Sequence, residues 1–386
     1  MSATLNVLPL LRGYGLDDHE AVVAVQSAAN QGGSRRTAKR VFELGLGDNH
    51  VAEVRFNSSL ALSSIIMSTK QWSAMRPLIE TDAQLHAARV ARTALFSYRE
   101  VKGFAQVPSW LQIRPVVCEL KDSTSFGALT TRTVAGVPLP FAVEVMFRHS
   151  ELPLLEGHRR IRAVQEATWL LGAFLDTPVF VLNSPFSWAF LEGAYHLVQC
   201  GMGLGLEEVP DKTFSDASGL PALQVVEQDR YFSELGISTP DFRVPDLAAL
   251  WGKYSKLGRD KKLRFLRACA SLSSAAQPGI THSQKLVALV TAIEPLLSPP
   301  ERCKSCNGQT GITRQFRKFL DEFLLPPPEI RDLYNGVYTA RSKIVHGGRR
   351  FEVDEPFLGI EVQGDLMPLV AWGAAKRGVV NWLCAQ

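Results

Sequence analysis

Large apolar residues recur at the spacing of an α-helix near residue 320, and three consecutive prolines follow them. The apolar positions are Phe316, Phe319, Leu320, Phe323 and Leu324, followed by Pro326, Pro327 and Pro328. Residues at this spacing share one face of a helix. Proline interrupts a helix but fits the first turn of the next one. The sequence therefore predicts an amphipathic helix that ends before the prolines and another that begins at Pro328.

Helical patterning extends over the whole region after Val244. A helix is expected over Asp260–Ser274. A second should begin at Thr281, because Gln284 completes the spacing of a capping box. Its apolar face carries Leu286, Val290, Ile293 and Leu297.

The last predicted helix runs from Pro328 to His346, where Gly347 and Gly348 supply a left-handed stop. Four helices with short connections predict a bundle. We therefore expect an all-α domain over residues 246–386.

Residues 1–245 have a mixed pattern, which predicts an α/β domain and an α+β fold for the chain as a whole. Runs rich in strand-forming residues are Val51–Phe56, Trp110–Glu119, Gly127–Val134, Pro140–Phe147 and Pro178–Leu182. Helical spacing is found over Thr81–Tyr98 and Arg160–Leu175. Residues 207–247 contain acidic residues together with Gly219-Leu220-Pro221, Thr239-Pro240 and Val244-Pro245, which indicates a linker between the two domains.

Composition indicates a globular protein without a membrane span. The chain has 386 residues, 46% apolar and 21% charged, with a formal net charge of +4. No run of eighteen apolar residues occurs, so a membrane partner is not expected. The six cysteines are scattered, which favours a reducing cytoplasm.

Arg341 falls near the middle of the apolar face of the last predicted helix. That face carries Ile330, Leu333, Tyr334, Val337, Ala340, Ile344 and Val345. A guanidinium there needs an anion, a partner chain or a water-filled cleft, because burial of an isolated charge is prohibitive.

His346 lies in the last turn of the same helix. An imidazole can transfer protons near neutral pH, and the guanidinium of Arg341 can stabilise charge that develops on a phosphate. In an ideal helix the two side chains are about 140° apart, so they flank a common cleft if the helix end unwinds or if two copies pair. In the alternative interpretation, Arg341 pairs with Glu294 as a structural ion pair and His346 caps carbonyl groups.

The string Val337-Tyr338-Thr339-Ala340-Arg341-Ser342-Lys343-Ile344-Val345-His346-Gly347-Gly348 resembles the signature of HEPN domains, in particular the Apea-like branch. The segment from Ala288 to Glu294 also resembles a helix of that branch. The resemblance covers roughly residues 255–350.

The resemblance implies a metal-independent endoribonuclease of a defence or toxin type, active as a homodimer through its C-terminal helical domain. Arg341 would bind the scissile phosphate of RNA and His346 would transfer the proton. Ser342, Lys343 and Tyr338 would be auxiliary substrate contacts. No cofactor and no metal are implied. Some HEPN domains are non-catalytic interaction or dimerisation modules, and this alternative stays open. The defence role implied by the resemblance also predicts a trigger molecule or a regulatory protein as the partner of the N-terminal domain.

Two weaker signals remain. Arg35, Arg36, Lys39 and Arg40 form a basic segment that either touches nucleic acid or is a solvated surface turn. Cys303 and Cys306 supply half of a zinc site, but a structural site needs two further ligands, so a plain loop with two thiols is the competing interpretation.

Overall fold

The computed structural model describes residues 3–30, 33–45, 50–116, 139–181, 186–190, 197–201, 211–228, 241–299, 311–326, 328–346 and 367–386. The chain forms two compact units. Unit 1 comprises Met1–Ala91, Met146–Val164 and Val209–Thr213, and unit 2 comprises Arg92–Val145, Gln165–Glu208 and Phe214–Gln386. The main sheets are antiparallel, so the α+β class expected from the sequence is confirmed.

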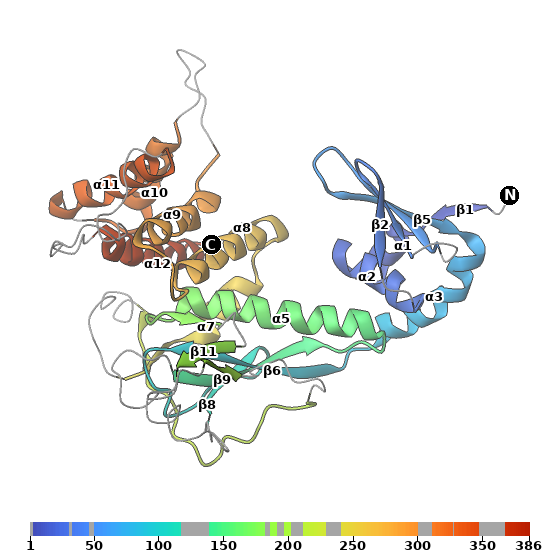
Figure 1. Cartoon of the computed structure of the whole chain (residues 1–386), viewed down its shortest axis with the longest axis horizontal. Helices are drawn as coiled ribbons and strands as arrows, with labels where there is room; N and C mark the ends of the chain where they lie inside the picture. Colours follow the sequence, from blue (N-terminus) through green and yellow to red (C-terminus); the bar gives the residue numbers. More distant parts are fainter. Residues whose placement is uncertain are drawn as a thin grey trace. The chain divides into compact units, whose positions relative to one another are not determined.

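Unit 1 holds a five-stranded sheet in the order β1-β5-β4-β3-β2 (Figure 1). Its strands are β1 (Thr4–Asn6), β2 (Ser34–Ala38), β3 (Val41–Leu44), β4 (Ala52–Phe56) and β5 (Leu62–Ser68). The accompanying helices are α1 (Leu8–Gly13), α2 (Asp18–Ala28) and α3 (Thr69–Gln84). Strand pairing aligns Phe42 with Val54 and Val54 with Ile65, which places these apolar side chains on one face of the sheet. That face forms a buried core with the three helices.

Local signals explain where the helices of unit 1 begin. The side chain of Ser68 accepts a hydrogen bond from Gln71 N, and the side chain of Gln71 accepts one from Ser68 N. Asp17 and Glu20 form the same reciprocal arrangement at the start of α2. Each capping box satisfies backbone donors that the first helical turn leaves without a partner.

The helix predicted over Thr81–Tyr98 is wrong. Helix α3 begins upstream and ends at Gln84, and Ala88–Ser97 forms strand β6. Leu95, Phe96 and Ser97 are buried in succession, as in a strand covered on both faces. The apolar spacing suggested a helix, but pairing on both sides within a sheet determines the structure.

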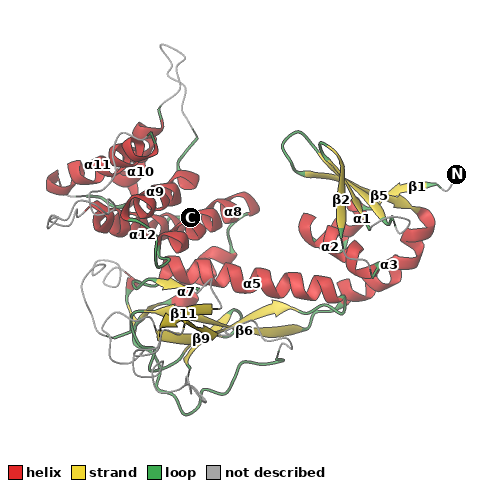
Figure 2. Cartoon of the chain, viewed as in Figure 1, coloured by secondary structure: helices red, strands yellow, loops and turns green. Residues whose placement is uncertain are grey.

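Unit 2 is built on a second five-stranded sheet, in the order β10-β6-β9-β8-β7. Its strands are β6 (Ala88–Ser97), β7 (Ala105–Val107), β8 (Leu111–Pro115), β9 (Leu139–Arg148) and β10 (Val179–Phe180). Short pairs follow in β11 (Phe186–Phe190) with β12 (Leu197–Gly201) and in β13 (Val225–Val226) with β14 (Val244–Pro245). Figure 2 separates these strands from the helices by colour. The strand predicted over Gly127–Val134 and the final residues of Trp110–Glu119 lie outside the described residues.

The helices predicted after Val244 are present. They are α8 (Arg259–Ala275), α9 (His282–Ile293), α10 (Ile312–Phe323) and α11 (Pro328–Val345). The structure adds α7 (Leu247–Ser255), a short 3-10 turn over Glu294–Leu296 and α12 (Met367–Cys384). The predicted helix over Arg160–Leu175 begins earlier, because α5 spans Pro153–Phe174. The HEPN type of the helical region stays a prediction.

Helix α12 is buried on most of its sides and packs against α7 to α11. Such a helix belongs at the centre of a bundle. Gly378 allows α10 to approach closely, since a Cβ atom there would lie 2.9 Å from Cε1 of Phe319.

The predicted domain boundary at residue 245 lies inside unit 2. Trp110 of β8 stacks on Trp251 of α7 with ring centroids 4.6 Å apart. Phe174 of α5 contacts Phe265 of α8 at 6.4 Å between centroids. The C-terminal helices therefore share aromatic packing with β8 and α5.

Candidate functional site

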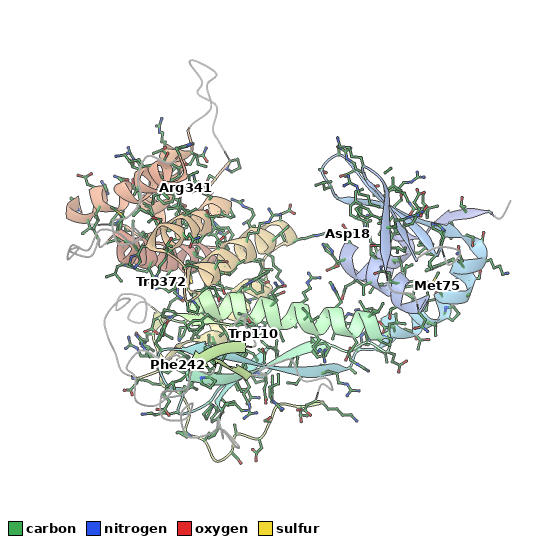
Figure 3. The ribbon with its side chains drawn as sticks, viewed as in Figure 1. Asp18, Met75, Trp110, Phe242, Arg341 and Trp372 are labelled. Carbon is green, nitrogen blue, oxygen red and sulfur yellow. The ribbon has the colours of Figure 1, made fainter. Side chains whose placement is uncertain are left out.

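Arg341 lies in α11 (Figure 3), and His346 directly follows Val345, the last residue of that helix. Helix α11 begins at Pro328, as expected for a residue that lacks a backbone donor. The amide of His346 donates to Ser342 O at 3.1 Å. Helical hydrogen bonding therefore continues through His346, and the helix does not unwind between Arg341 and His346. The predicted stop at Gly347-Gly348 lies outside the described residues.

Arg341 forms an ion pair with Glu294, with 3.1 Å between Nη2 and Oε1. Glu294 is the residue at which α9 ends and the 3-10 turn begins, and Pro295 follows it. The two side chains are 22% and 23% exposed. The guanidinium carbon also lies 5.9 Å from the ring centroid of Tyr338. Nε of Arg341 is buried and has no hydrogen-bond partner among the described residues.

The ion pair with Glu294 is the contact expected in the alternative interpretation, in which Arg341 has a structural role. A carboxylate at this distance offsets much of the positive charge. A guanidinium nevertheless has five N–H donors, and the pair with Glu294 engages one nitrogen. The partial exposure of Arg341 leaves solvent access to the group.

His346 is exposed, and Lys343 is exposed as well, whereas Ser342 is half-buried. Because the helix is continuous, His346 lies about 140° around its axis from Arg341. One copy of α11 therefore does not direct both side chains to the same phosphate.

Tyr338 is 7% exposed, and its ring lies 5.1 Å from that of Phe316 in α10. Burial leaves little of this ring for contact with a substrate. Its role in the structure is to pack α11 on α10 and to lie beside Arg341.

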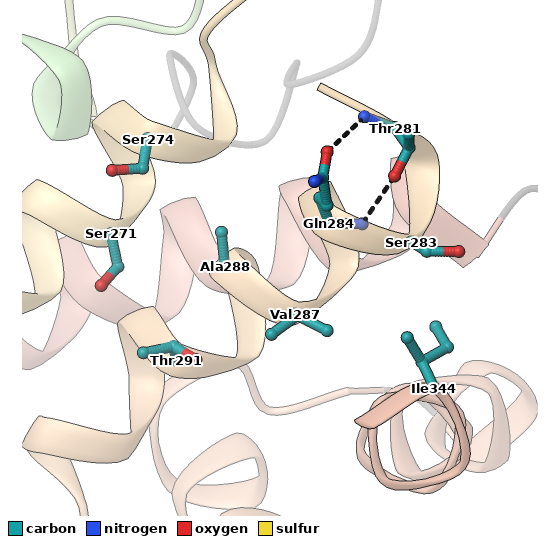
Figure 4. Close-up of a pocket in the computed structure, with 9 residues that line it drawn as sticks. All are labelled: Ser271, Ser274, Thr281, Ser283, Gln284, Val287, Ala288, Thr291 and Ile344. Atoms are coloured by element: carbon teal, nitrogen blue, oxygen red, sulfur yellow. Dashed lines mark hydrogen bonds between the residues drawn. The ribbon is translucent and has the colours of Figure 1, made fainter. Parts of the chain in front are cut away.

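A groove of about 630 Å³ lies between α8, α9 and α11 (Figure 4). Six of its lining side chains are polar and uncharged: Ser271, Ser274, Thr281, Ser283, Gln284 and Thr291. Val287 and Ala288 complete it from α9, and Ile344 from α11. Ile344 lies between Arg341 and His346 in sequence, so the groove adjoins the last turn of α11. Ser274 donates to Ala270 O, and Thr281 and Gln284 bond each other in the capping box, so these polar groups already have partners within α8 and α9. The exposed lining of the groove is mainly apolar.

Sequence reasoning did not identify this groove. Its signal was present in Ser271, Ser274 and Thr291, which are polar residues on the facing sides of α8 and α9. Serine and threonine are common on exposed helices. Only the packing of α9 between α8 and α11 brings them together.

No known family model, curated protein or solved structure matches this chain. Over the described ranges, no group of three or more His, Cys, Asp or Glu side chains is placed to hold a metal ion. Cys303 and Cys306 lie outside those ranges. None of the described helices has the length and apolar character needed to cross a bilayer.

Proposed function

We propose that the chain is a metal-independent endoribonuclease of a defence or toxin type, in which Arg341 and His346 act on RNA at a site shared by two copies of α11. The observation that carries this proposal is a partly exposed guanidinium and an exposed imidazole on the final turns of one continuous helix. An antiparallel or crossed pair of α11 helices would bring Arg341 of one copy toward His346 of the other.

The proposed chemistry is transesterification within the RNA strand. The neutral imidazole of His346 removes the proton from a ribose 2′-hydroxyl, whose oxygen attacks the adjacent phosphorus. The bond from phosphorus to the 5′-oxygen breaks, and the imidazolium returns the proton to that oxygen. The products are a 2′,3′-cyclic phosphate and a 5′-hydroxyl, so the step consumes no water.

Arg341 would bind the non-bridging phosphate oxygens while charge builds on them. In this role Glu294 orients the guanidinium through one nitrogen and leaves other N–H groups for phosphate. Lys343 and Ser342 would add contacts at the exposed end of the helix, and the groove beside Ile344 would receive the neighbouring nucleoside.

A second candidate is a non-catalytic interaction or dimerisation module. The ion pair between Arg341 and Glu294 favours it, because pairing reduces the charge available to a phosphate. Exposed apolar side chains on α11 also favour it, with Leu333 39% and Val345 50% exposed. In that case alanine at Arg341 or His346 leaves the biological activity intact, and substitutions at Leu333 and Val345 abolish it.

Incubation of the purified full chain with total RNA in EDTA separates these candidates. We expect Arg341→Ala and His346→Ala each to slow cleavage about 100-fold or more, the usual effect of losing a proton-transfer or phosphate-binding group. The matched controls are Arg331→Ala, an exposed arginine of the same helix, and His86→Ala, an exposed histidine of a loop. Both controls should cleave like the wild type. The nuclease proposal would be contradicted if the wild type and both site variants left the same amount of RNA intact, although the wild type is toxic when expressed in cells.

A further inference from the structure

The β2–β3 hairpin of unit 1 is an exposed edge of its sheet. Strand β2 is the last strand in the order β1-β5-β4-β3-β2 and pairs only with β3. All five of its residues, Ser34–Ala38, are exposed. In Figure 1 the turn that joins β2 to β3 stands at the end of the sheet away from α1, α2 and α3. Strand β2 is thus accessible along its length, and Lys39 in the turn is exposed, whereas β3 carries Phe42 and Leu44 on the core side of the sheet.

Basic residues are concentrated in this hairpin. Residues 1–91 contain nine Lys/Arg and eight Asp/Glu, so this part of the chain is nearly neutral. Four of the nine basic residues fall within positions 35–40: Arg35, Arg36, Lys39 and Arg40. The hairpin contains a single acidic residue, Glu43. Positive charge is therefore gathered at one place.

These cations differ from other arginines of unit 1 in how they are partnered. Arg12, Arg55 and Arg76 each pair with a carboxylate. In the hairpin, Arg35 pairs with Glu43 at 3.0 Å. No carboxylate among the described residues pairs with Arg36, Lys39 or Arg40.

Local structure holds the tip in a defined shape. The pairing register shifts between Arg36 and Ala38, as at a β-bulge, which increases the twist of the ribbon and redirects its side chains. The Arg36 guanidinium donates to Ala38 O at 3.2 Å and to Lys39 O at 3.0 Å. Arg36 therefore supports the turn that presents Lys39 and Arg40.

We propose that the β2–β3 hairpin binds the phosphate backbone of double-stranded nucleic acid, with Lys39 and Arg40 as its main phosphate contacts. The major groove of B-form DNA admits a two-stranded β-ribbon, and backbone phosphates flank that groove. When lysine and arginine side chains neutralise phosphates, counterions are released from the nucleic acid, and this release stabilises the complex. This surface lies in unit 1 and is independent of the nuclease proposal.

Charge on an edge strand also prevents pairing with another chain. Lysine is common in that role, but Lys39 and Arg40 lie in the turn after β2 and not along the edge that needs protection. Positive charge accumulates at the tip, whereas arginines elsewhere in the same unit are neutralised by carboxylates. This contrast favours a polyanionic ligand for the hairpin.

The test is binding of the full chain to fluorescent DNA duplexes about 20 base pairs long, measured by anisotropy over a range of salt concentrations. The double variant Lys39→Gln/Arg40→Gln should bind about tenfold more weakly than the wild type. Its plot of log affinity against log salt should be less steep by about two units, because each lost phosphate contact removes about 0.9. The charge-conserving variant Lys39→Arg/Arg40→Lys should bind like the wild type.

A control removes two exposed charges elsewhere in unit 1, in Lys70→Gln/Arg76→Gln. It should keep both the affinity and the salt slope of the wild type. Unchanged binding and slope in Lys39→Gln/Arg40→Gln would overturn the proposal. Competition by polyglutamate as effective as that by duplex, at equal total charge, would overturn it as well, because the partner would then be an acidic protein. Duplex DNA has no ribose 2′-hydroxyl, so the result is independent of RNA cleavage.

Discussion

Lys376 of α12 is fully buried, and this makes the stability of unit 2 depend on pH. Its Nζ donates to Gly172 O at 2.5 Å and to Leu175 O, two carbonyl groups at the C-terminal end of α5. Burial lowers the pKa of Lys376 from 10.5 to about 7, and the nearby carboxylate of Asp176 opposes this shift. Neutral lysine still has two N–H donors for the two carbonyls.

The direction of the effect follows from proton binding. Between pH 7 and 10.5 the unfolded chain holds a proton on Lys376 that the folded chain has released. The free energy of unfolding therefore rises with pH through this window. One pKa unit corresponds to about 1.4 kcal/mol. The free-energy cost of burying Lys376 is therefore about 2 kcal/mol smaller at pH 8.5 than at pH 6.5.

The substitution Lys376→Met removes the titration while keeping an unbranched chain of similar length. We expect the difference in unfolding free energy between variant and wild type to shift by about 2 kcal/mol between pH 6.5 and pH 8.5. The shift should favour the wild type at the higher pH. Other titrating groups cancel in this comparison, although loss of the bonds to α5 adds a constant cost at both pH values.

Urea unfolding followed by tryptophan fluorescence measures this difference, because six of the seven tryptophans belong to unit 2. The denaturant slope should be the same for both proteins. Parallel pH profiles of the wild type and Lys376→Met would refute the reasoning, since they would show that Lys376 keeps its ordinary pKa in the fold.

Two further predictions concern helix packing and capping, and both are measured by urea midpoints. Gly378→Ala places a methyl group 2.9 Å from Phe319 and should lower the free energy of unfolding by about 1–3 kcal/mol. In Gly373→Ala the new methyl group meets nothing within 4 Å, and the free energy of unfolding should rise by about 0.5–1 kcal/mol. Shifts of the same sign in both would contradict the close approach of α10 and α12. Thr281→Ala removes the hydroxyl that accepts from Gln284 N and should cost about 1 kcal/mol, while Thr281→Ser should cost much less. Equal losses in these two variants would exclude capping as the cause.

The features predicted correctly from the sequence are those that local chemistry determines. Thr281 and Gln284 form the predicted capping box, and Pro328 begins α11. Pro295 acts in the same local way, since α9 gives way to a 3-10 turn at Glu294. Each of these signals acts within a few residues of the chain, so no knowledge of the tertiary fold was needed.

The features that were missed depend on packing between distant segments. Strand β6 showed helical spacing, but its neighbours β10 and β9 make it a strand. Helix α12 is apolar around most of its circumference and therefore lacks a clear helical period. At the candidate site, Arg341 and Glu294 could be named as partners from their faces, and the ion pair is present. The groove beside Ile344 required the arrangement of three helices.

The proposed shared site makes a direct prediction for mixed variants. Arg341→Ala and His346→Ala should each be inactive alone, because every site in either homodimer lacks one of the two groups. After subunit exchange in an equal mixture, half of the dimers should contain one intact site, and cleavage should recover to about one quarter of the wild-type rate. A mixture that cleaves RNA no faster than its separate components, alongside an active wild type, would contradict a site composed of Arg341 from one copy and His346 from the other.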